Sequence, residues 1–170
     1  MNALRERPQS SVSAALLLAF ERQGKPLGRI PMVVRLNLDL CGLSFGLDDW
    51  VGLDLETRIA LSSRIADTPE AARHWARMVF DCVPAARPCD IDPSELLGLD
   101  CATPTARINA QLESLDLPIL DGAAWRALST LQRYALLKLS RPGHKNRNFE
   151  KVAREVRGHD VAKQKYAETW

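Results

Sequence analysis

Polar side chains that could do chemistry gather in the short segment 141–148, RPGHKNRN. Two arginines frame this segment, and a guanidinium can bind a carboxylate or a phosphate through two parallel hydrogen bonds. A helix is expected to follow directly, and the backbone N–H groups at the start of a helix favour negative charge. The segment is therefore predicted to bind an anion or an acidic partner. The residues assigned to this site are Arg141, His144, Lys145, Arg147 and Asn148.

Two other interpretations of this segment stay open. Arginine and asparagine side chains at this place could cap helix ends and hold two parts of the fold together. His144 could act as a general base, which needs an orienting carboxylate, and Glu150 is the local candidate. We assign no catalytic residue, and we add Arg35 and Asp39 from far upstream to the predicted binding site.

The short motifs of several common enzyme classes are absent. The sequence has no GxxxxGK[ST], GxGxxG, GxSxG or HExxH. The cysteines are separated by 41, 7 and 12 residues without a CxxC pair, whereas zinc and iron–sulfur sites usually draw ligands from close pairs. We therefore predict no enzyme activity, metal or cofactor, and a metal or redox role for Cys82, Cys89 and Cys101 is the alternative. The four cysteines are Cys41, Cys82, Cys89 and Cys101.

The helix that precedes the segment has clear boundaries. Ser129 and Gln132 form a capping box, in which each side chain satisfies a backbone N–H of the first turn. The apolar run 131–139 predicts a buried helix, and Pro142-Gly143 is expected to stop it. Phe149 is expected to anchor the far end of the segment.

The pattern around this helix occurs twice. Five residues recur with the same types 75 positions later: Trp50, Leu53, Arg58, Ala60 and Leu61 return as Trp125, Leu128, Arg133, Ala135 and Leu136. Such self-similarity indicates a duplication. The predicted fold is all-α, with two pseudo-symmetric helical repeats sharing one core. The predicted organisation is a single domain, 1–170, with repeat one at about 27–83, a linker at about 84–102, repeat two at about 103–158 and a charged tail at 159–170.

The repeated arginines and tryptophans are expected to be structural. A lone arginine on an apolar helix needs a partner if it is buried. The carboxylates of Asp39, Asp48 or Asp49 are the expected partners of Arg58 and Arg133. Trp50 and Trp125 are expected to anchor the core.

The remaining helices are predicted from residues that cap or end a helix. Residues 30–45 alternate like a strand but also fit a helix that starts at Pro31, and the helical spacing of the second copy favours helix in both. Three further helices are predicted with both ends: from Ser10 or Ser11 to Arg22, from Asp54 to Ile65, and from Arg147 to Val156 with Gly158 as the stop. For the others only the start is predicted: Asp48, Thr68, Ser94 for one or two turns, Thr103-Pro104 and Asp121.

The composition of the chain indicates which kinds of molecule it could bind and where it is expected to act. The chain of 170 residues is 46% hydrophobic and 26% charged. Its longest apolar run, 14–20, is too short to span a membrane. No signal-peptide cleavage site follows that run, which weighs against export. The cytoplasm is the expected compartment. The middle of the chain is acidic and its end is basic, so the end could face an acidic protein, an anionic ligand or its own acidic middle. The lack of interleaved exposed aromatics weighs against nucleic acid.

Five motifs together resemble the nitrate reductase-associated protein family over about 20–156. They are Ile30-Pro-Met-Val-Val-Arg35, Leu38-Asp39-Leu40-Cys41-Gly42, Trp50 followed by Arg58, Thr68-Pro69-Glu70, and Leu139-Ser-Arg-Pro-Gly-His144 with Asn148-Phe149. The chain differs from the family in lacking a cysteine near Ala66-Asp67, in a reduced N-terminal stretch and in its tail after Gly158.

The resemblance implies an accessory role. Members are associated with the assimilatory molybdenum-containing nitrate reductase and support production of active enzyme, without a known catalytic activity of their own. The expected partner is nitrate reductase or another molybdoenzyme. The alternatives are a small-ligand-binding protein or small enzyme with a pocket between the repeats, and a purely structural subunit. The oligomeric state is not predicted.

Overall fold

A computed structural model describes residues 12–91, 94–142 and 147–167. These residues form two compact units, one of residues 12–17 and 21–90, the other of residues 18–20 and those described from 91 onward. The boundary at Asp90 lies inside the predicted linker 84–102, and the assignment of a single domain stays a prediction. Among the described helices, none combines the length and the hydrophobicity that a membrane span requires.

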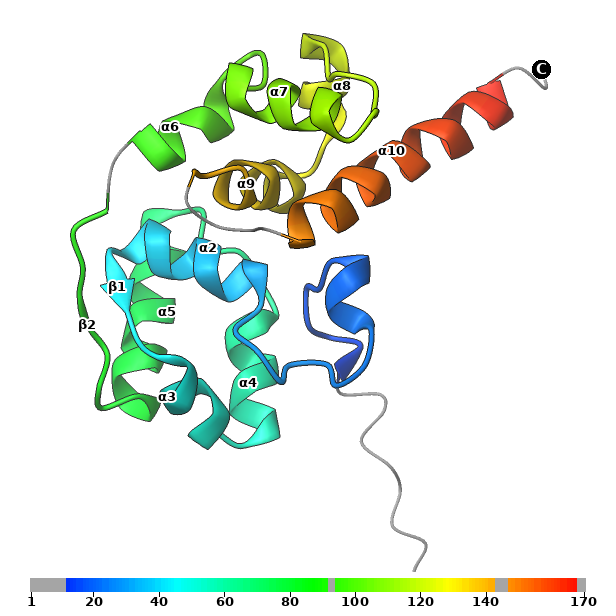
Figure 1. The fold of residues 1–170 in the computed structure, drawn as a ribbon. Coiled ribbons are helices and arrows are strands. Elements are labelled where there is room, and N and C mark those ends of the chain that lie inside the picture. The colour runs from blue at the N-terminus through cyan, green and yellow to red at the C-terminus, as the bar shows by residue number, and fades with distance from the viewer. Residues whose placement is uncertain (1–11, 92–93, 143–146, 168–170) are drawn as a thin grey trace, which may run out of the picture. The chain divides into compact units, whose positions relative to one another are not determined.

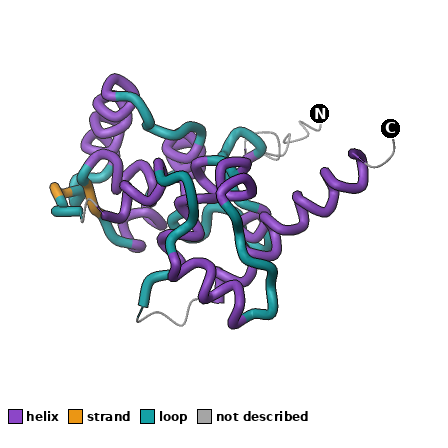
Figure 2. Tube along the Cα trace, turned by 90° about the horizontal axis from the view of Figure 1, so that it is seen from above, coloured by secondary structure: helices purple, strands orange, loops and turns teal. Residues whose placement is uncertain are grey.

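Both units are mostly helical, as the all-α prediction requires (Figure 2). In the first unit α2 contacts α4 and α5, and α4 contacts α5 (Figure 1). One small antiparallel strand pair joins Leu43 to Pro88 and Ser44 to Arg87. The elements are η1 (Ala19–Arg22), which spans the boundary between the units, α2 (Met32–Cys41), β1 (Leu43–Ser44), α3 (Leu47–Gly52), α4 (Leu55–Ser62), α5 (Pro69–Cys82) and β2 (Arg87–Pro88).

In the second unit α9 contacts both α6 and α10. A Cβ added to Gly98 on α6 would lie 2.8 Å from Cδ2 of Leu137 on α9, closer than such atoms normally approach. Glycine is therefore needed there for the close contact of these two helices. The elements are α6 (Ser94–Asp100), α7 (Ala106–Ser114), α8 (Gly122–Ala127), α9 (Thr130–Leu139) and α10 (Arg147–Ala167).

The helical interpretation of residues 30–45 is confirmed for Met32–Cys41, and within this range only Leu43–Ser44 form a strand. α2 follows Pro31 and ends at Gly42, whose φ of 63° is the left-handed conformation that glycine adopts easily. Val34, Leu36 and Leu38, which alternate with polar residues in the sequence, are buried together with Val33 and Asn37. The alternation therefore reflects a helix that is buried around much of its circumference.

Asn37, 0% exposed, ties α2 to the connection between α4 and α5. Its Nδ2 donates to the carbonyl of Arg64 at 2.9 Å, and its Oδ1 accepts from the N–H of Ala66 at 2.8 Å. A buried polar side chain must be satisfied in this way, because an unmade hydrogen bond costs about 1–3 kcal/mol. The burial of Asn37 thus helps to set where α5 begins.

Four of the predicted helix caps are confirmed. The Asp54 carboxylate accepts from the N–H of Thr57 at 2.7 Å, and this bond is the main cause that lowers the pKa of Asp54. The hydroxyl of Thr68 accepts from Ala71 at 3.1 Å. Asp121 and Ser129 cap their helices in the same way, and Ser129 with Gln132 completes the predicted capping box. Side chains adjacent in sequence therefore set these helix starts.

Several predicted boundaries are wrong. No helix runs from Ser10 or Ser11 to Arg22 through the described residues, because Leu16–Leu18 are irregular and only Ala19–Arg22 form a 3-10 turn. The N-cap of α7 is Thr105 rather than Thr103. α4 ends at Ser62 rather than near Ile65. α9 ends at Leu139, three residues before Pro142, and Gly143 lies outside the described residues.

The largest correction concerns the C-terminal helix. α10 was expected to end near Val156, with Gly158 as the stop and a charged tail beyond it. Instead it continues through Gly158 to Ala167 (Figure 1). Gly158 does not have positive φ, so it does not act as a helix cap.

Replacing Gly158 with alanine should therefore stabilise the protein. A Cβ at this position meets nothing within 4 Å. Alanine in a helix interior is favoured over glycine by about 0.5–1 kcal/mol. Urea unfolding followed by circular dichroism measures the change. Gly42→Ala, at a positive φ, is the matched control and should destabilise. A loss of stability in Gly158→Ala would contradict a continuous α10.

Candidate functional site

The start of the predicted binding segment is held by a buried serine. Ser140, 1% exposed, follows the last residue of α9, and its hydroxyl donates to the carbonyl of Leu137 at 3.0 Å. Nε of Arg107 on α7 donates to the same hydroxyl at 3.1 Å, and Nε2 of Gln111 donates to the carbonyl of Ser140 at 3.3 Å. α7 therefore fixes the point at which the segment leaves α9.

The far end of the segment is held by α10. Phe149 is 3% exposed, as its predicted anchoring role requires. Arg147, the first residue of α10, is exposed, and Asn148 is half-buried. Arg141 is half-buried and already has an interaction partner. Of the described site residues on this segment, Arg147 is thus the one most available to a partner.

The middle of the segment lies outside the described residues. His144 and Lys145 are part of this stretch. The roles assigned to these two residues, including the general-base hypothesis for His144, stay predictions. Glu150, the carboxylate considered for orienting His144, accepts from Nε of Arg154 at 2.9 Å.

Arg35 and Asp39 lie four residues apart on α2. Arg35 is exposed and its Nε donates to the carbonyl of Ile30 at 3.2 Å. Asp39 is half-buried and has an interaction partner. Both belong to the first unit, whereas segment 141–148 belongs to the second. The grouping of all seven residues into one site therefore stays a prediction.

Arg58 has the predicted structural role, but the prediction that a carboxylate pairs with it is wrong. Nε and Nη2 of Arg58 donate to the carbonyl of Leu53 at 2.9 and 2.8 Å, and Nη1 donates to the carbonyl of Leu27 at 3.2 Å. Asp49 accepts instead from the N–H of Gly46 at 2.8 Å. Arg58 thus satisfies the backbone rather than a carboxylate.

Arg133 has the same kind of partner. Its Nη1 donates to the carbonyl of Leu99, and its buried Nε has no hydrogen-bond partner. Trp125, 0% exposed, donates from its Nε1 to the carbonyl of Cys101 at 3.0 Å. The core role predicted for Trp125 is confirmed, as is that of Trp50, which is also 0% exposed.

The cysteines differ in burial, and none belongs to a cluster of metal ligands in the described part of the chain. Burial raises the pKa of the Cys41 and Cys82 thiols, which disfavours the thiolate needed for nucleophilic attack or metal binding. Cys89 and Cys101 are exposed free thiols. Among the described residues, no group of three or more His, Cys, Asp or Glu side chains could hold a metal ion.

The sequence did not reveal which residues anchor the start of segment 141–148. Arg107 and Gln111 are polar residues on a helix of mixed composition, and nothing in their spacing points to Ser140. A serine directly after an apolar helix was the available signal. The described arrangement offers cationic donors at a fixed place, which suits binding of an acidic group.

Replacing Ser140 with alanine should destabilise the protein by about 0.5–1.5 kcal/mol, because the part-buried hydrogen bond from Nε of Arg107 to the Ser140 hydroxyl would be lost. Urea unfolding measures this loss. Ser114→Ala is the matched control, since the Ser114 hydroxyl is exposed and donates to one carbonyl, that of Gln111. Equal effects of the two substitutions would contradict the anchoring role of Ser140.

Comparison with known proteins identifies the family. The family model described as conserved nitrate reductase-associated protein matches residues 17–156. Searches of curated proteins and of solved structures gave no match. The matched span runs from just before η1 into α10 and includes segment 141–148. Since the match covers most of the 170 residues, the chain belongs to the conserved nitrate reductase-associated protein family.

Proposed function

We propose that the protein is a non-enzymatic accessory or maturation factor for an assimilatory, molybdenum-dependent nitrate reductase. The observation that carries this proposal is the family match over residues 17–156, because the family is described by its association with nitrate reductase. The proposed place of action is the cytoplasm.

The proposed contact is made by segment 141–148. Its ends are anchored by Ser140 and Phe149, both buried. Anchored ends reduce the entropy that a loop loses on binding, and this supports a binding role for the segment. Arg141 and Arg147, with His144 and Lys145 between them, would grip an acidic segment of the reductase or the phosphate of its cofactor.

The proposed fold includes the internal duplication. Hydrogen bonds at equivalent places support it. The indole of Trp50 donates to the carbonyl of Leu27 at 2.9 Å, and that of Trp125 donates to the carbonyl of Cys101 at 3.0 Å. Each acceptor precedes the first long helix of its predicted repeat. The two copies then differ in detail, because Arg58 donates to the carbonyls of Leu27, Val51 and Leu53, whereas Arg133 donates to that of Leu99.

Deleting the gene should lower nitrate reductase activity while the amount of reductase polypeptide stays normal. A maturation factor acts after the polypeptide is made, so activity per polypeptide is the informative ratio. Activity assays and immunoblots of the same extracts measure it. Unchanged activity in the deletion strain would remove nitrate reductase as the client.

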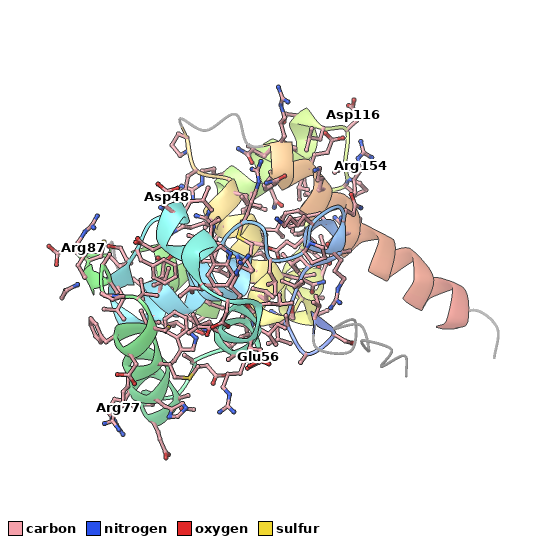
Figure 3. All side chains as sticks on the ribbon, turned by 90° about the horizontal axis from the view of Figure 1, so that it is seen from below. Asp48, Glu56, Arg77, Arg87, Asp116 and Arg154 are labelled. Atoms are coloured by element: carbon pink, nitrogen blue, oxygen red, sulfur yellow. The ribbon has the colours of Figure 1, made fainter. Side chains whose placement is uncertain are left out.

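Replacing Arg141, His144 and Arg147 together with alanine should prevent rescue of the deletion strain and leave helical content intact. The matched control is Arg73→Ala with His74→Ala and Arg77→Ala, which removes the same residue types from the exposed face of α5. Arg77 points away from α5 toward solvent (Figure 3). Rescue by the segment variant to the level of the control would overturn the proposed contact.

A further inference from the structure

The outer face of α10 carries a row of cations that extends beyond the predicted site. Arg147, Lys151 and Arg154 are all exposed and are spaced by four and then three residues. Because an α-helix has 3.6 residues per turn, this spacing places them on one face. The opposite face is buried and consists of Phe149, Val152, Ala153 and Val156. We call Arg147, Lys151 and Arg154 the α10 cationic row.

One carboxylate beside this row pairs with a member of the row, and the other accepts from the backbone of η1. Glu150 accepts from Nε and Nη2 of Arg154 at 2.9 and 2.8 Å, and Glu155 accepts from the N–H of Ala19 at 2.9 Å. Arg147 and Lys151 have no hydrogen-bond or ion-pair partner among the described residues.

The pair between Arg154 and Glu150 is a weak restraint. The two side chains are 60% and 46% exposed, and exposed pairs four residues apart are easily exchanged for other partners. Arg154 can therefore bind an incoming carboxylate. Arg147 and Lys151 consequently present positive charge that no described residue pairs with, and Arg154 adds a cation from an exposed ion pair.

We propose that the α10 cationic row docks an acidic segment of nitrate reductase. This inference rests on the proposed function and deepens it, because it names the surface that receives the client. It extends the contact from segment 141–148 along two further turns of α10, with Arg147 common to both. Charge complementarity identifies the occupant as a stretch rich in aspartate and glutamate.

The spacing of the row limits the shape of that stretch. A helix rises about 1.5 Å per residue, so the Cα atoms of Arg147 and Arg154 lie about 10 Å apart along the axis. Carboxylates about 5–7 Å apart match this row, as on one face of an acidic helix or at alternate positions of an extended segment.

A nucleic acid fits the row less well. Proteins that bind single strands combine cations with exposed aromatic side chains on which bases stack. The aromatic residue of this part of α10, Phe149, is buried on the opposite face.

The test changes Lys151 and Arg154 and leaves segment 141–148 intact. Lys151→Glu with Arg154→Glu should weaken binding to purified nitrate reductase from the same host by at least about tenfold, because like charges would then face each other. Isothermal titration calorimetry measures the dissociation constant. Lys151→Ala with Arg154→Ala should weaken it by a smaller factor and avoids new repulsion within α10. Circular dichroism checks that both variants keep their helical content.

Arg73→Glu with Arg77→Glu on α5 is the matched control, with the same change in net charge, and should bind like the unchanged protein. If the unchanged protein does not bind the reductase, the proposed function fails together with the docking surface. If it binds and both α10 variants bind equally tightly, the docking surface alone is overturned. Tighter binding to a duplex or single-stranded oligonucleotide, lost in the same variants, would overturn a protein partner.

Discussion

The fold depends on side chains that satisfy backbone carbonyls in the irregular segments between short helices. The carbonyl of Leu27 is the clearest case, because it accepts from Nε1 of Trp50 at 2.9 Å and from Nη1 of Arg58 at 3.2 Å. Leu27 has a φ of 60°, a conformation that costs a residue with a side chain about 1–2 kcal/mol. Two buried or half-buried donors on one carbonyl offset that cost and hold the entry to α2 in place.

The same requirement accounts for many polar residues of the second unit. Asn109 bonds both the N–H and the carbonyl of Leu120, at 3.0 and 3.1 Å. Arg157 donates to the carbonyls of Pro118 and Ile119. Short helices leave many of their terminal backbone groups unpaired, so long polar side chains must reach them. An arginine in this protein is therefore not by itself a sign of a binding site. The better candidates for binding a partner are cations that do not hydrogen-bond to backbone carbonyls.

Sequence reasoning succeeded where the interaction is local and failed where it is not. The caps at Asp54, Thr68 and Ser129 could be predicted because donor and acceptor lie three residues apart. The acceptors of Arg58 could not be, because a backbone carbonyl has no signature in the sequence. Gly158 was misread for a related reason: whether a glycine ends a helix depends on its φ, and its neighbours in sequence do not reveal that value.

Several charges of the acidic middle and of the basic end of the chain lie at the surface of the second unit. Asp121 caps α8, while Glu113 and Asp116 are exposed. Arg154 is also exposed (Figure 3). It pairs with Glu150 of its own helix. Charges that are not neutralised internally keep a field that reaches about 8–10 Å into physiological solution. A partner with an acidic surface would therefore be oriented toward α10 before any close contact forms.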